Sequence, residues 1–127
     1  MLAPGDHVPH FEVTSIEGRP VTYAGIWQRR SLAVVVLPAG CADPVAGGVS
    51  ELLGHRGEFE RHQAELVVTC DPISGLMAPA AAIADRWGEI AYAVETTHAA
   101  DLPRPSELLA WIEHVQNRCP ECEGESK

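Results

Sequence analysis

The chain has 127 residues, which is enough for one domain with a single hydrophobic core. Its formal net charge is -9, with Lys127 as the only lysine, so we expect neither nucleic acid nor an anionic membrane as a partner. No apolar run approaches the roughly 20 residues of a membrane span, and residues 1–6 do not resemble a signal peptide. We therefore expect a cytoplasmic protein, whose four cysteines are thiols, redox groups or metal ligands rather than structural disulfides.

The first predicted elements are two short strands that pair as a hairpin. Residues 11–16 alternate apolar and polar side chains, as a half-exposed strand does. Residues 17–20 contain glycine and proline and predict a turn, after which residues 21–23 return as the second strand. Residues 24–30 then connect this hairpin to the centre of the domain.

The centre of the domain is an apolar strand followed by a cysteine. Leu32 to Leu37 is an unbroken run rich in β-branched residues, which is typical of a strand buried on both faces. Pro38 ends the run, Cys41 lies in the turn that follows, and residues 45–65 predict a helix that glycines interrupt. The N-terminus of a helix favours a thiolate. Cys41 is therefore the residue at which we expect chemistry.

The second half of the chain predicts a strand, a hairpin and a helix. A buried strand over residues 66–70 completes a right-handed parallel crossover with the central strand. Residues 73–78 are too few for another full helix. Residues 80–84 and 89–94 then predict the two strands of an antiparallel hairpin. A final helix follows over residues 106–118, with Ser106 as its N-cap. We expect one domain over residues 1–118 and a tail over residues 119–127.

This order of elements resembles the thioredoxin superfamily, and more narrowly its peroxiredoxin-like branch of alkyl hydroperoxide reductases and thiol-specific antioxidant proteins. The residues that carry the resemblance are Gly5, Pro9-His10-Phe11 and Gly18-Arg19-Pro20-Val21 at the entry hairpin, then Pro79, Asp85 and Gly88. The resemblance implies a thioredoxin-like α/β sandwich, with a central mixed sheet, an N-terminal β-hairpin, flanking helices and a reduced second crossover helix. It also implies that Pro79 is a cis-proline beside the Cys41 turn, and that Ala78 offers backbone hydrogen bonds to a thiol substrate.

The chain departs from the motifs of this superfamily in two places. Thioredoxins carry Cys-x-x-Cys, whereas this chain has Cys41-Ala42-Asp43-Pro44, so Cys41 has no resolving thiol nearby in sequence. Peroxiredoxins carry Pro-x-x-x-Thr/Ser-x-x-Cys, and Val34 and Pro38 stand at the first two of those positions. The sequence therefore lacks the motif that binds and polarises a peroxide.

Three further cysteines have alternative interpretations. Cys70 ends a buried strand, which favours a structural, packed thiol over a disulfide with Cys41 at the same sheet edge. Cys119 and Cys122 form a Cys-x-x-Cys, a spacing that suits a redox dithiol or half of a tetrahedral zinc site. The final helix is expected to run away from Cys41 for roughly 20 Å. The pair could therefore resolve Cys41 of another subunit, share a zinc ion between two chains, or have no role.

Two hypotheses about function follow. The first is a cytoplasmic thiol oxidoreductase without a cofactor, acting on a thiol or disulfide protein or a small oxidant. In it Cys41 is the catalytic thiol, and Cys119 and Cys122 resolve it in trans within a homodimer. The second is a non-catalytic thioredoxin-fold module whose Cys119 and Cys122 bind zinc or mediate dimerisation. A Cys41 with a pKa well below about 8.5 favours the first hypothesis, and bound metal favours the second.

Overall fold

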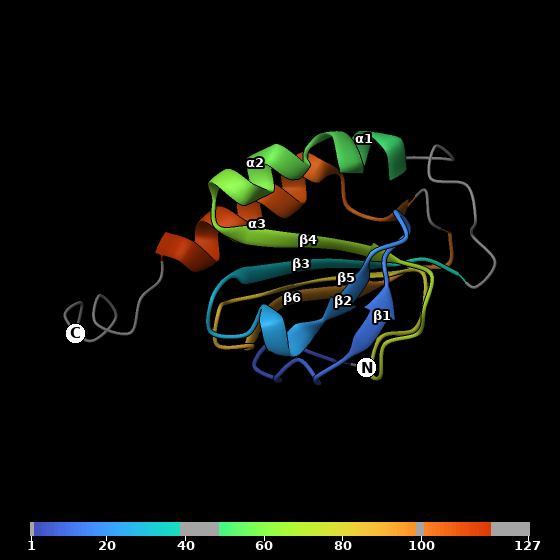
Figure 1. Ribbon diagram of the computed structural model, residues 1–127, viewed down its shortest axis with the longest axis horizontal. Helices are drawn as coiled ribbons and strands as arrows, with labels where there is room; N and C mark the ends of the chain where they lie inside the picture. Colours follow the sequence, from blue (N-terminus) through green and yellow to red (C-terminus); the bar gives the residue numbers. More distant parts are fainter. Residues whose placement is uncertain (1, 39–48, 99–100, 118–127) are drawn as a thin grey trace.

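The computed structural model describes residues 2–38, 49–98 and 101–117, and contains a four-stranded sheet and a separate hairpin (Figure 1). The hairpin consists of β1 (Glu12–Thr14) and β2 (Pro20–Thr22). The sheet consists, in chain order, of β3 (Ser31–Val36), β4 (Ala64–Thr69), β5 (Ala80–Ala84) and β6 (Ile90–Glu95). The helices are η1 (Tyr23–Gly25, 3-10), α1 (Val49–Gly54), α2 (Arg56–Arg61) and α3 (Pro105–Asn117).

The four-stranded sheet is mixed, and β3 lies inside it. The strand order is β4-β3-β5-β6, with β3 parallel to β4 and antiparallel to β5. Every residue of β3 is buried, as its unbroken apolar sequence predicts. Val36 is in register with Thr69 of β4 and with Ala80 of β5. The ends of β3 and β4 and the start of β5 therefore meet at one edge of the sheet.

The two faces of the sheet are covered by different parts of the chain. Figure 1 shows α1, α2 and α3 together on one face, where Phe59 and Ile112 are fully buried. The N-terminal segment covers the other face, where Phe11 and Tyr23 are buried against the sheet. Residues 73–78 form no helix, which confirms the predicted reduction of the second crossover helix. No described helix is long and apolar enough to cross a membrane.

Several element boundaries differ from those the sequence predicts. The helix of residues 45–65 is broken, because α1 ends at Gly54 and α2 begins at Arg56; residues 45–48 lie outside the described part of the chain. The N-cap prediction for Ser106 is wrong. The helix already begins at Pro105, since proline fits the first helical position, and the Arg104 carbonyl accepts the first N–H groups.

An ion-pair network holds the hairpin region against the edge strand β4. Arg56 donates a hydrogen bond to the Leu66 carbonyl at 2.9 Å, contacts Glu17, and lies 3.8 Å from Glu65. Arg30 donates to the same Glu65 carboxylate at 3.1 Å. The network covers an edge of β4 that would otherwise be open to pairing with another strand.

Tyr23 is a buried residue whose hydroxyl has no hydrogen-bond partner among the described residues. Its side chain is 1% exposed, and its ring stacks on Phe11 at a centroid distance of 5.4 Å. Burial, and secondarily the nearby Asp85 carboxylate, raise the pKa of Tyr23 to about 12. The phenolate is therefore strongly disfavoured in the folded protein.

Replacing Tyr23 with Phe is expected to raise the free energy of unfolding by about 1 kcal/mol at pH 7, because it removes an unpaired buried polar group and keeps the ring. Above pH 10 the unfolded Tyr23 ionises while the folded Tyr23 stays neutral, so the wild type loses stability that the variant keeps. Urea unfolding at pH 8 and pH 11 should show the advantage of the variant growing by about 1 kcal/mol. A constant or shrinking difference would contradict this account.

Candidate functional site

The candidate site lies where the parallel strands β3 and β4 end together. The Leu37 N–H donates to the Thr69 carbonyl at 2.8 Å, so the two chain segments are still paired at the last residue of β4. Cys70 follows directly after this pairing. Cys41 lies three residues after Pro38 in the sequence, outside the described residues, as do Cys119 and Cys122.

Cys70 packs against the core cluster on the helical side of the sheet, as the sequence predicts, but it is disulfide-bonded, so the prediction of a free structural thiol is wrong. It lies past the end of β4 and is only half-buried, whereas the four strand residues directly before it are buried. The apolar sequence of the strand suggested burial, but the strand ends one residue before the cysteine. Cys70 is the one cysteine in the described ranges, and the other three all lie outside them.

The backbone on both sides of Cys70 is anchored to β1. The Thr69 hydroxyl donates to the Thr14 carbonyl at 2.7 Å, and the Thr14 N–H donates to the Asp71 carboxylate at 2.7 Å. The Asp71 N–H closes the turn by donating to the Thr69 hydroxyl at 3.0 Å. Because the residues before and after Cys70 are both held by the hairpin, the position of the Cys70 backbone is well defined.

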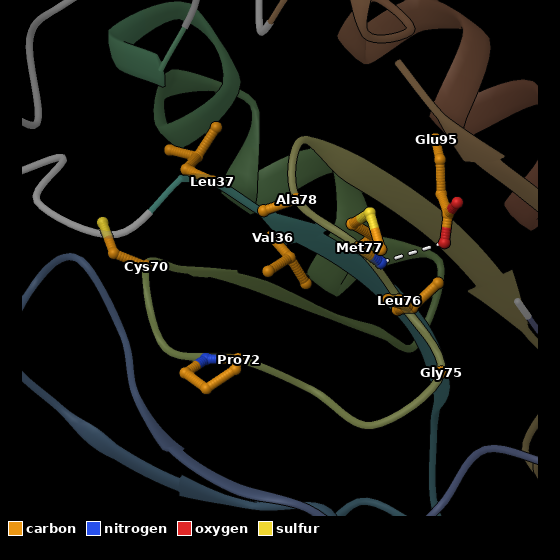
Figure 2. Close-up of a pocket in the computed structure, with 9 residues that line it drawn as sticks. All are labelled: Val36, Leu37, Cys70, Pro72, Gly75, Leu76, Met77, Ala78 and Glu95. Carbon is orange, nitrogen blue, oxygen red and sulfur yellow. Dashed lines mark hydrogen bonds between the residues drawn. The ribbon is translucent and has the colours of Figure 1, made fainter. Parts of the chain in front are cut away.

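An open, largely apolar groove of about 540 Å³ lies beside Cys70 (Figure 2). Figure 2 shows Cys70 and Pro72 on one side of it, Met77 and Ala78 on the other, and Val36 between them. Its complete set of lining residues is Val36, Leu37, Cys70, Pro72, Gly75, Leu76, Met77, Ala78 and Glu95. The groove therefore brings the ends of β3, β4 and β6 together with the loop that precedes β5.

The loop that precedes β5 is held in place by β6 and the residue after it. The peptide bond between Ala78 and Pro79 is cis, as the resemblance to thioredoxins implies. The Thr96 N–H donates to the Pro79 carbonyl at 2.9 Å, and the Met77 N–H donates to the Glu95 carboxylate at 2.9 Å. Ala78 lines the groove, so it lies where a substrate could pair with its backbone; the roles of Ala78 and Pro79 in catalysis stay predictions.

The far end of α3 lies away from this site. His62, next to the start of β4, lies 4.0 Å from Glu113 near the end of α3, and Figure 1 shows that helix running away from the edge where β3 and β4 end. Within the described ranges, no group of three or more His, Cys, Asp or Glu side chains could hold a metal ion. Zinc binding by Cys119 and Cys122 stays a prediction, because both residues lie outside those ranges.

Leu76, Met77 and Glu95 are among the groove residues that were not predicted from the sequence. Leu76 and Met77 lie in the loop before β5 and Glu95 ends β6, and sequence spacing does not indicate that these segments face one another. The structure itself draws attention to Met77, which is 75% exposed and is the most exposed of the large hydrophobic residues described. An exposed, flexible thioether is typical of an adaptable binding surface.

Comparison with known proteins gives matches at the level of structure. No family model matches the chain, and no curated protein matches it by sequence. The structure is similar to a reduced 2-Cys peroxiredoxin from Plasmodium vivax, with a TM-score of 0.71 and 14% identity over 91% of this chain and 98% of that one. It is also similar to AhpC from Mycobacterium tuberculosis, with a TM-score of 0.69 and 14% identity over 95% and 98% of the two chains.

The chain therefore has the peroxiredoxin fold. A third similar structure is a yeast mitochondrial 1-Cys peroxiredoxin, with a TM-score of 0.68 and 12% identity over 91% of this chain and 77% of that one. The thioredoxin-like fold expected from the sequence is confirmed. At this level of identity the comparison establishes the fold alone.

Proposed function

We propose that this protein is a thiol–disulfide oxidoreductase with the peroxiredoxin fold, in which Cys41 is the attacking thiol and Cys70 is the second thiol. The observation that carries the proposal is the disulfide at Cys70, at the edge of the sheet where the parallel strands end and beside an open groove. A disulfide in such a place is accessible to exchange, unlike one buried in a core.

The choice of Cys41 as the partner of Cys70 is supported by topology. Leu37 is hydrogen-bonded to Thr69, and Cys41 is only four positions after Leu37 along the chain. A disulfide needs a Cα–Cα distance of about 5.5 Å, well within the reach of a four-residue segment. Cys119, by contrast, comes two residues after the end of α3, a helix roughly 20 Å long that leads away from this edge.

Disulfide exchange is better supported than peroxide reduction. Peroxiredoxins use a hydroxyl three residues before the reactive cysteine, and Pro38 supplies none at that position. Val34, at the position of the motif's proline, is 1% exposed in the middle of β3 and cannot line an open site. The groove instead offers apolar contact to the carbon chain of a disulfide substrate.

The proposed reaction has two steps. The Cys41 thiolate attacks one sulfur of a disulfide R–S–S–R, which forms a mixed disulfide and releases R–S⁻. Cys70 then loses its proton and attacks the Cys41 sulfur, which releases the second R–S⁻ and leaves the Cys41–Cys70 disulfide. Two protein thiols are oxidised, one substrate disulfide is reduced, and the two protons go to the released thiolates. A reducing thiol of the cytoplasm would return the protein to its dithiol form.

The test is the alkylation rate as a function of pH for a variant that keeps only Cys41, with Cys70, Cys119 and Cys122 replaced by serine. We expect Cys41 to titrate at least about one unit below 8.5. Peptide mapping of the oxidised wild type should show a Cys41–Cys70 link within one chain. Interchain links from Cys41 to Cys119 or Cys122 would instead support resolution in trans within a homodimer. An unreactive Cys41 in a protein that binds about half a zinc ion per chain would overturn the proposal in favour of a metal-linked dimer.

A further inference from the structure

The groove beside Cys70 is largely apolar, but the charged groups in the segments around it are negative. Most of its lining residues come from residues 70–78, and strand β6 contributes Glu95. Together they contain two carboxylates, Asp71 and Glu95, and neither lysine nor arginine. Glu95 lines the groove directly, and Figure 2 shows its carboxylate turned toward the Met77 backbone. Any ligand in the groove therefore experiences a negative local potential, added to that of a chain with a net charge of -9.

The size and surface of the groove favour a small ligand with an aliphatic body. Its volume of about 540 Å³ lies within the range of small-molecule sites. Leu76 and Met77 offer aliphatic and thioether surface, and the exposed Met77 side chain can adapt to different shapes. Apolar contact supplies binding energy, and the Glu95 carboxylate at the groove favours a ligand of positive charge.

We propose that the substrates of this site are small aliphatic disulfides that carry positive charge, and that the groove discriminates against anionic disulfides such as oxidised glutathione. This inference rests on the proposed function and names its substrate class. The chemistry is the two-step exchange described above, so each cationic disulfide is reduced to two thiols as the protein dithiol becomes a disulfide. Glu95 is the specificity-determining residue, because its carboxylate is the charge that lines the groove.

The experiment compares three disulfides of different charge: cystamine (+2), bis(2-hydroxyethyl) disulfide (neutral) and oxidised glutathione (-2). The reduced full-length protein is mixed with each, and the oxidation rate is divided by the rate of the same disulfide with free 2-mercaptoethanol, which removes intrinsic reactivity. At low salt the corrected rate for cystamine should exceed that for oxidised glutathione by about 10-fold or more. The ratio should fall to within about threefold in 1 M salt, where the Debye length is about 3 Å.

A matched pair of variants locates the source of the selectivity. Glu95→Gln keeps an oxygen that can accept the Met77 N–H and removes one charge at the groove. Glu89→Gln removes one charge just before the other end of the same strand. We expect Glu95→Gln to lower the cystamine preference by about threefold or more at low salt, and Glu89→Gln to change it by less than about 1.5-fold.

The outcomes separate this inference from the proposed function. Corrected rates that are high but equal for the three disulfides would overturn the charge selectivity and leave the oxidoreductase intact. An equal effect of Glu89→Gln and Glu95→Gln would overturn the assignment to the groove. Rates no faster than those of free 2-mercaptoethanol, with all three disulfides, would overturn the proposed function and the inference together.

Discussion

Replacing Cys70 with serine is expected to lower the steady-state rate of disulfide reduction by about 100-fold or more, because the second step then has no intramolecular thiol. Cys70 is held beside the groove by Thr69 and Asp71, which are both hydrogen-bonded to Thr14. A thiol fixed in this way acts at an effective concentration far above that of a free thiol in solution. The serine variant keeps the attack by Cys41 and loses the release of the product.

The measurement is a single-turnover reaction followed by mass spectrometry. The Cys70→Ser variant should accumulate a mixed disulfide on Cys41, whereas the wild type should pass to the internal disulfide. A double variant, Cys119→Ser with Cys122→Ser, serves as the control and should turn over at the wild-type rate. If the control loses turnover and Cys70→Ser keeps it, the second thiol comes from the C-terminal pair and the proposed role of Cys70 is wrong.

The central part of the fold could be predicted because its sequence signals are local. The apolar run of β3 and the apolar start of the second parallel strand each indicate a buried strand, and the fold places them side by side. Strand β5 has the predicted bounds, although its alanine-rich sequence alone would favour a helix. The turn after it, and the alternation in β6, decide in favour of a hairpin.

The groove could not be predicted, because it depends on contacts between distant segments. Glu95 reaches the Met77 backbone only after β6 has paired with β5, and no spacing in the sequence indicates that contact. The state of Cys70 was missed for a related reason. Strand propensity indicates that a strand is present but not which residue is its last. It also does not indicate whether a cysteine at the end of a strand is bonded to another sulfur, as Cys70 is.

Replacing Phe59 with Ala is expected to lower the free energy of unfolding by about 3–5 kcal/mol. The reason is that Phe59 holds the helical layer on the sheet. Phe59 is fully buried on α2, in the core cluster that α3 and the sheet share. Helix α2 has only six residues, too few to be stable without packing, so its anchoring side chain holds it against β4. Its loss leaves a cavity that the rigid sheet on one side cannot fill by moving.

Urea unfolding followed by far-UV circular dichroism gives the change directly, and the melting temperature should fall by roughly 10–20 °C. Met77→Ala is the control, because Met77 is 75% exposed and its removal should change the free energy of unfolding by less than about 0.5 kcal/mol. Phe59→Leu, which fills part of the space, should lie between the two. A Phe59→Ala variant as stable as the Met77→Ala control would mean that α2 does not hold the helical layer on the sheet. In that case α3 alone would have to cover this face of β3 and β4, which end beside the groove.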